Sequence, residues 1–182
     1  MILRDLGSMD EVPFSADDVL EGCLSGDCGG AHQIRFSVEG RNDCLRFYKA
    51  EAGTEKRSPL VFLEGDVVHL ASPYGEPPLW RVAEFYQKLT PNLMQGEVSF
   101  YAASAGRTLI NLARPGIFGS TGHHLERRRP REVALVDAAL DALKGRSGWK
   151  FFDLAGFSGG RPSGWSASRT ARRHWLRHYR VG

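Results

Sequence analysis

Long apolar runs and a recognisable export signal are both missing from this sequence of 182 residues. No run of about 18 apolar residues occurs, so we expect no membrane-spanning helix. Residues 1–20 lack the basic-then-apolar order of a signal peptide, which favours a cytoplasmic location. The alternative is an exported protein, if the natural N-terminus carries a signal. Because 42% of the residues are hydrophobic, the chain is long enough to bury one sizeable core.

Cysteine is scarce, with three residues at Cys23, Cys28 and Cys44. Cys23 and Cys28 lie in a Gly/Ser-rich stretch and suit a local disulfide in an exported protein, whereas reduced, structurally unimportant thiols are the favoured interpretation. A zinc site is disfavoured because no second closely spaced pair follows and the nearest histidine, His32, is isolated. No residue pattern supports a metal or an organic cofactor.

Acidic residues are absent from the last stretch of the chain. Six of the 24 Lys and Arg residues, and none of the 21 Asp and Glu residues, lie between Arg161 and Gly182. The basic character of the protein therefore belongs to this tail, and the rest of the chain is slightly acidic.

Hydrophobic periodicity predicts alternating strands and helices. Alternation over 33–38 and 44–49 around a polar turn predicts a β-hairpin. Continuous apolar runs predict buried strands, and helical spacing predicts amphipathic helices, the second capped by Gly145. Residues 1–30 show no sustained hydrophobic period and are expected to be a loosely held extension. No helix or strand is assigned to 90–106, because its hydrophobic pattern defines neither. The expected buried strands are 59–63, 108–113 and 150–155, and the expected helices are 79–89 and 132–144.

This order predicts an α/β domain over residues 31–160, with a mostly parallel sheet and helices on both faces. Reactive groups in such sheets gather at the carboxyl ends of the strands. Three loops are expected at that edge, namely 64–66, 114–120 and the turn at Ser158.

The last of these turns has the pattern Gly156-x-Ser158-x-Gly160 after an apolar strand. A serine at the apex of a sharp strand-to-helix turn needs small neighbours, and the following helix directs its first N–H groups at the reaction centre. The pattern is short, but the preceding strand strengthens it as a nucleophile elbow.

Three motifs together resemble the α/β-hydrolase superfamily, nearest to the dienelactone-hydrolase and prolyl-oligopeptidase-like enzymes. They are a strand ending at Gly65, the turn Arg114-Pro115-Gly116-x-x-Gly119-Ser120, and the elbow. The resemblance covers residues 33–160. It implies that Ser158 is the nucleophile and that the backbone N–H groups of Gly159 and Asp66 form the oxyanion hole.

The chain departs from this family in two ways. The family usually has His-Gly where this chain has Glu64-Gly65, and its catalytic acid and histidine follow the serine on later strands. The tail 161–182 holds His174 and His178 but no acid to orient them. Earlier histidines are expected to lie in solvated loops or on the surface rather than to act as the base: His32, His69, His123 and His124.

One hypothesis for this departure is a shifted reading frame near Gly160. Dropping the first base of the Arg161 codon permits a glycine, an apolar helix with a basic end and then a buried strand, as the fold requires after its elbow. Sequencing the gene through the codons for 157–168 would test this idea. On this hypothesis the domain is truncated after the elbow.

Two functions therefore remain open. The first is a serine hydrolase, an esterase or peptidase acting on a small acyl ester or peptide through an acyl-enzyme, and expected to be inactive in this truncated form. The second is a non-catalytic remnant or binding protein acting through the Arg-rich tail, which could bind nucleic acid or an acidic membrane surface, although nucleic acid is disfavoured as a partner. Truncation would also expose the edge of the last strand and promote self-association.

Overall fold

The computed structural model describes residues 11–23, 30, 32–53, 58–73 and 76–160 together with the backbone of 180–181. Its centre is a six-stranded mixed sheet with the strand order β1-β2-β6-β3-β7-β8, and a separate two-stranded sheet pairs β4 with β5. The strands are β1 (Gln33–Val38), β2 (Arg41–Ala50), β3 (Leu60–Leu63), β4 (Val68–Leu70), β5 (Trp80–Val82), β6 (Leu109–Leu112), β7 (Phe152–Gly156) and β8 (Arg180–Val181). The helices are α1 (Ala16–Glu21), α2 (Pro91–Ala105) and α3 (Pro130–Ser147), with short 3₁₀ turns η1 (Tyr86–Lys88), η2 (His124–Glu126) and η3 (Ser158–Gly160).

The three central strands, β6, β3 and β7, are parallel to one another. Both edges are antiparallel, because β2 pairs with β6 and β8 pairs with β7 in that sense. The expected parallel sheet is therefore confirmed for the core of the sheet, while the sheet as a whole is mixed.

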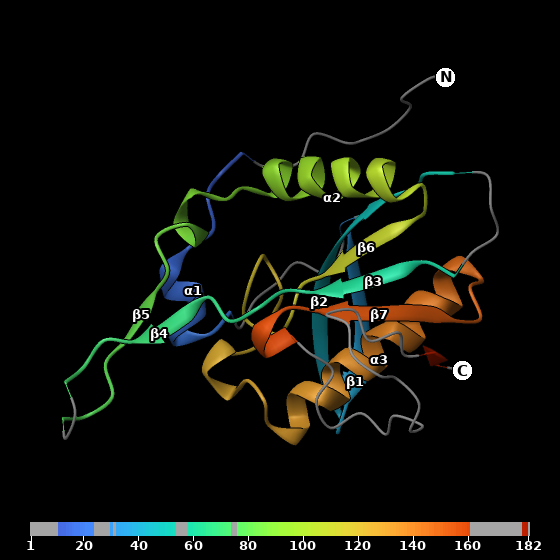
Figure 1. Cartoon of the computed structure of the whole chain (residues 1–182). Helices are drawn as coiled ribbons and strands as arrows, with labels where there is room; N and C mark the ends of the chain where they lie inside the picture. The colour runs from blue at the N-terminus through green and yellow to red at the C-terminus, as the bar shows by residue number, and fades with distance from the viewer. Residues whose placement is uncertain are drawn as a thin grey trace, which may run out of the picture.

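The two long helices cover opposite faces of this sheet (Figure 1). Met94 and Val98 of α2 belong to one hydrophobic cluster, which also includes Val19 of α1. Val136 and Leu140 of α3 pack with strand residues in a second cluster. The α/β class predicted from periodicity is thus confirmed, with one helix between β3 and β6 and another between β6 and β7.

The predicted hairpin is confirmed, with a tighter turn than expected. The strands pair from Gln33 with Arg46 to Val38 with Arg41, so Glu39 and Gly40 alone form the turn. Their φ angles are +52° and +75°, the left-handed conformation that tight hairpin turns require at both central positions.

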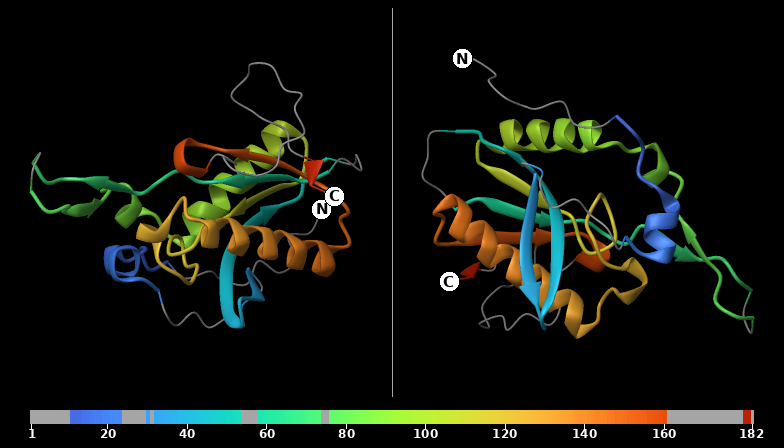
Figure 2. Two further views of the ribbon diagram at one scale, coloured as in Figure 1. Left: turned by 90° about the horizontal axis from the view of Figure 1, so that it is seen from below. Right: turned by 180° about the vertical axis from the view of Figure 1, so that it is seen from behind.

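The helix expected over 79–89 is wrong. Residues 80–82 form β5, whose register places Trp80 opposite Leu70, and Tyr86–Lys88 forms only the 3₁₀ turn η1. Val82 and Tyr86 are buried, so the apolar spacing reflects burial although the backbone is not helical. Figure 2 shows that β4 and β5 form an arm extending from the body.

The undefined stretch 90–106 contains α2. Thr90 caps this helix by accepting a hydrogen bond from the Leu93 N–H at 3.2 Å, Pro91 occupies the first turn, and Gly106 ends it with φ +60°. The helix α3 also runs longer than expected. Gly145 lies inside it, and the cap is Gly148 with φ +73°.

Residues 11–23 do not form a loose extension, so that expectation is wrong for them. Ser15 caps α1, and the Phe14 ring packs against those of Tyr86 and Phe118, with centroid distances of 5.5 and 5.4 Å. Residues 1–10 and 24–29, including Cys28 of the proposed disulfide, lie outside the described residues.

The outer edge of β7 is not wholly exposed. Arg180 and Val181 of β8 pair with Asp153 and Phe152, so the expected open edge is wrong at these two positions. The remaining tail, residues 161–179 and 182, lies outside the described residues. In the part of the chain that is described, no helix has the length and apolar character needed to cross a membrane.

Candidate functional site

The loops that follow β3, β6 and β7 meet at one edge of the sheet. Because these strands are parallel, their carboxyl ends lie on the same side (Figure 1). The three loops expected at this edge from the sequence are therefore brought together.

Ser158 lies at the apex of the turn that follows β7. Its φ angle is +49°, a conformation that is strained for a residue other than glycine and that clusters at functional sites. The residue is exposed. The Gly160 N–H donates to the Phe157 carbonyl at 2.8 Å, which closes the turn. The strand thus ends in a sharp turn, whose last residues form the single 3₁₀ turn η3. The helix expected after the serine falls on residues outside the described ones.

The glycines around Ser158 are required by close contacts with the loop after β3. A Cβ atom at Gly160 would lie within 3.0 Å of the carbonyl oxygens of Leu63 and Glu64. A Cβ atom at Gly65 would meet the Phe157 ring at 3.1 Å and the Cβ of Ser158 at 3.4 Å. The predicted motif glycines therefore allow two loops to pack against each other. Gly156, the remaining one, ends β7 opposite Leu63.

Asp66 extends over the elbow, and the two residues expected to supply oxyanion N–H groups are neighbours. A Cβ atom at Gly159 would lie within 3.0 Å of both carboxylate oxygens of Asp66. The structure thus brings Gly159 and Asp66 together, with the acidic side chain of Asp66 packed against the glycine.

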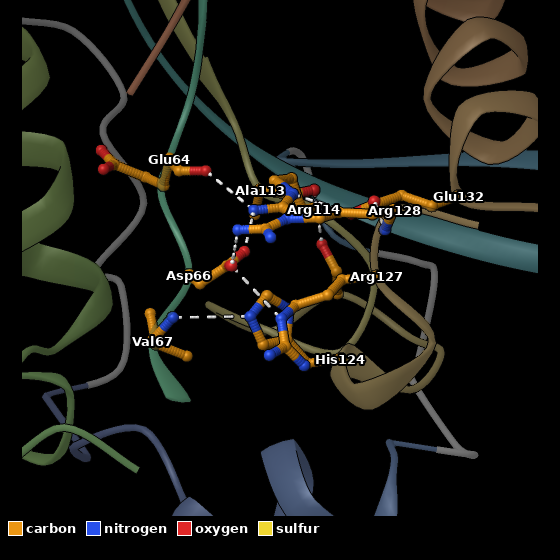
Figure 3. Close-up of polar contacts among 10 residues, drawn as sticks. Glu64, Asp66, Val67, Ala113, Arg114, His124, Arg127, Arg128 and Glu132 are labelled. Carbon is orange, nitrogen blue, oxygen red and sulfur yellow. Dashed lines mark hydrogen bonds and ion pairs between the residues drawn. The ribbon is translucent and has the colours of Figure 1, made fainter. Parts of the chain in front are cut away.

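Three arginines hold this carboxylate (Figure 3). Asp66 Oδ1 accepts from Arg114 at 2.9 Å, and Oδ2 lies 2.5 Å from Arg128 and 3.2 Å from Arg127. Burial opposes ionisation, but the hydrogen bond from Arg114 and the charges of the three arginines hold the pKa of Asp66 below its usual value. The carboxylate is therefore ionised and fixed in place.

Arg114 connects three elements at this edge. Its side chain is 2% exposed, and its Nε donates to Glu132 of α3 at 2.8 Å. Its Nη1, which contacts Asp66, also donates to the Glu64 carbonyl at 3.2 Å. These bonds join the ends of β6 and β3 to the first turn of α3. The sequence analysis named Arg114 only as part of a turn. Its position as a charged residue just after an apolar strand could have identified it as a site residue.

The turn after β6 is structural. Ser120 is buried, its hydroxyl donates to the Ala113 carbonyl at 3.1 Å, and it accepts from the Arg46 N–H at 2.9 Å. Gly116 and Gly119 have φ angles of +73° and +85°. Their backbone conformation lets the loop fold back on β2 and explains the glycine pattern.

His124 is fully buried, so the expectation of a solvated loop histidine is wrong for this residue. Its Nε2 accepts from the Val67 N–H at 3.4 Å. Burial, with the nearby charge of Arg114, lowers the pKa of His124 to about 3, so the ring is neutral at pH 7. It fixes the loop after β3 and makes no described hydrogen bond to Ser158.

The other histidines do not complete the site either. The Nδ1 of His123 accepts from the Leu125 N–H at 3.2 Å and caps η2. His69 is exposed on β4, and His32 is half-buried against Phe47. His174 and His178 lie in 161–179, outside the described residues. The described part of the chain therefore brings no histidine to Ser158.

Glu64, which replaces the family's histidine, forms a partly buried polar pair on the α2 side of the sheet. Asn111 donates from Nδ2 to its Oε1 at 2.7 Å. Burial raises the pKa of the Glu64 carboxyl, although the hydrogen bond from Asn111 acts in the opposite direction. Figure 3 shows its side chain directed away from the arginines, so Glu64 contributes its backbone to the site.

Within the described residues, no three His, Cys, Asp or Glu side chains converge as they would in a metal site. A scan against protein-family models finds no match for this chain, and a search of the curated proteins finds no similar sequence.

Proposed function

We propose that this protein is a serine hydrolase of the α/β-hydrolase type, an esterase or peptidase, with Ser158 as its nucleophile. The observation that carries the proposal is the left-handed φ of +49° at Ser158. A serine held in this conformation at the carboxyl end of a buried parallel strand is the arrangement that the nucleophile elbow requires.

The surrounding fold supports the same proposal. An antiparallel hairpin forms one edge, and parallel strands with helices on both faces follow. The serine comes directly after β7, which lies beside β3, and the loop that ends β3 packs on the elbow through Gly65.

In the proposed reaction, Ser158 Oγ attacks the carbonyl carbon of an ester or amide while its proton passes to a general base. The tetrahedral oxyanion accepts from the backbone N–H groups of Gly159 and Asp66. Collapse breaks the bond to the leaving group, which takes up the proton, and water then hydrolyses the acyl-enzyme. The negative charge of the Asp66 side chain would oppose the oxyanion, so its neutralisation by the three arginines supports this role.

The proposed reaction needs a general base. Without it, serine is a weak nucleophile, because its hydroxyl must lose a proton as attack occurs. In this fold the acid and histidine follow the serine in the chain. The Nε2 of the buried, neutral His124 already accepts a hydrogen bond from the Val67 N–H. We therefore assign the base to no described histidine.

The test is labelling of the purified chain with a fluorophosphonate, which reacts with activated serines. If the chain supplies a base that activates Ser158, the wild type and Ser104→Ala, an exposed serine of α2, are labelled and Ser158→Ala is not. Heating the protein before exposure must abolish the signal. Labelling that survives Ser158→Ala, or its absence from a wild type shown to be folded by circular dichroism, would contradict the proposed activity.

A chain without activity would favour the non-catalytic alternative. That function would then require salt-sensitive binding to nucleic acid that disappears when residues 161–182 are deleted.

A further inference from the structure

The segment that leads into α3 is strongly basic. Four of the five residues 127–131 are arginines. Arg131 pairs with two carboxylates of the hairpin region, so its charge is neutralised there. Arg129 is exposed and, like the exposed Glu126, forms no ion pair in the described part of the chain. The two remaining arginines point toward the edge of the sheet that holds the elbow.

These two arginines, Arg127 and Arg128, converge on one oxygen atom (Figure 3). Asp66 Oδ2 lies 3.2 Å from Arg127 and 2.5 Å from Arg128. The other oxygen of Asp66 is bound by Arg114, which also pairs with Glu132. Three arginines therefore face two carboxylates, which leaves one positive charge in excess at this edge.

Arg127 is held in a fixed orientation. The centre of its guanidinium group lies 4.6 Å from the centroid of the Trp80 ring, and its side chain is 13% exposed. Its terminal nitrogens donate no hydrogen bond within the described residues, although an arginine has several N–H donors. A stacked guanidinium group with unused donors is well suited to bind a carboxylate.

Arg128 presents its side chain to solvent from a strained backbone. Its φ angle is +64°, and its N–H donates to Glu132 Oε2 at 2.5 Å. This left-handed conformation is costly for a residue other than glycine, and such strain clusters at functional sites. The side chain is 60% exposed, so most of its donors are open to a ligand.

The carboxylate of Asp66 lies between these arginines and the elbow. A Cβ atom at Gly159 would be within 3.0 Å of both Asp66 oxygens, and Gly159 directly follows Ser158. A ligand bound by Arg127 and Arg128 is therefore separated from the turn of the proposed nucleophile by about the width of one carboxylate.

We propose that Arg127 and Arg128 bind a carboxylate of the substrate, which makes the substrate an acidic ester or an acidic peptide. This inference rests on the proposed function and names the class of its substrate. A planar guanidinium group and a carboxylate form two parallel N–H···O bonds. The bound carboxylate also neutralises the excess positive charge, which a neutral ester does not.

Binding of glutarate, a small dicarboxylate, tests this site by isothermal titration calorimetry at constant ionic strength. About two charge-assisted hydrogen bonds correspond to a dissociation constant on the order of 1 mM. Dimethyl glutarate has the same chain length without the charges and should not bind. Arg128→Gln should weaken glutarate binding at least tenfold, because it removes a charged donor.

Two further variants separate this site from a general effect of charge. Arg127→Lys keeps the charge but loses the planar group, so glutarate should bind at least threefold more weakly. Arg35→Gln removes an exposed arginine of β1 and should leave the affinity unchanged. Circular dichroism confirms that each variant is folded.

Ser158→Ala distinguishes the carboxylate site from the hydrolase. It should bind glutarate as the wild type does, because the arginines are untouched. Glutarate binding by a chain that the fluorophosphonate never labels would retain the carboxylate site and remove the hydrolase. Labelling of Ser158 without glutarate binding would do the reverse.

The proposal is overturned if the wild type binds no glutarate up to about 20 mM, well above the expected dissociation constant. It is also overturned if dimethyl glutarate binds equally well. Unchanged affinity in Arg128→Gln, or an equal loss of affinity in Arg35→Gln, would mean that glutarate responds to the overall charge of the protein.

Discussion

The carboxylate of Asp66 occupies the space that a side chain at position 159 would need. A Cβ atom on Gly159 would lie within 3.0 Å of the Cγ and both oxygens of Asp66. Arg114, Arg127 and Arg128 hold that carboxylate from the other side. The elbow and the loop after β3 are thus shaped by each other, which makes the site sensitive to single methyl groups.

Gly159→Ala should disrupt the elbow. The methyl group cannot be accommodated by rotating Asp66, because three arginines fix it, so we expect a loss of about 1–3 kcal/mol in the free energy of unfolding. Urea denaturation measures this loss. In the background of Asp66→Ala, which frees the space, the same substitution should cost much less. Equal costs in both backgrounds would show that the two residues do not compete for space.

Ser158→Gly should stabilise the protein while removing the proposed nucleophile. Glycine adopts a positive φ without strain, so relief at this position should raise the free energy of unfolding by about 1 kcal/mol. Ser158→Ala keeps the strain and provides the comparison. If both variants unfold at the same urea concentration, Ser158 is not strained in solution.

Arg114→Met, which keeps a long side chain but removes its charge, should strongly destabilise the fold at this edge of the sheet. It leaves the carboxylates of Asp66 and Glu132 without their shared partner in a site where the arginine is 2% exposed. Breaking a buried ion pair in this way costs about 3–5 kcal/mol. Asp141→Asn removes only the exposed pair with Lys144, and a change of about 0–1 kcal/mol is expected there. Similar urea midpoints for both variants would contradict the role of Arg114.

His124 should make the fold sensitive to mild acid. The pKa of His124 is about 3 in the folded protein and 6.5 in the unfolded chain. Between these pH values the unfolded chain therefore binds a proton that the folded chain does not. The free energy of unfolding is therefore unaffected by this group above pH 6.5. Below pH 6.5 it decreases by about 1.4 kcal/mol for each pH unit.

His124→Gln should flatten this dependence, because the glutamine oxygen can still accept from Val67 without titrating. Unfolding free energies of both proteins between pH 7 and pH 4 give the comparison. Parallel curves would mean that His124 is not the group responsible.

Local patterns in the sequence were sufficient for much of the framework. Period-2 alternation predicted the hairpin of β1 and β2, and the apolar runs predicted β3, β6 and β7, because each pattern lies within one element. The glycine spacing around Ser158 predicted a sharp turn after β7 for the same reason.

Features that depend on packing were missed. The outward face of α2 carries Leu93 and Phe100 beside its polar residues, so the helix has no clear period. In β5 the apolar spacing fits a helix equally well, and pairing with β4 decides the outcome. The arginine cluster joins Asp66 to residues about 50 to 60 positions later, a distance that no local pattern reports.

The placement of β3 has a consequence for synthesis on the ribosome. Leu60 pairs with Leu109 on one side and with Asp153 on the other, so both neighbours of β3 are translated long after it. Until β6 emerges, β3 has two open edges and an apolar sequence, a combination that invites aggregation. A nascent chain paused before residue 109 should therefore depend on chaperones that bind extended apolar segments.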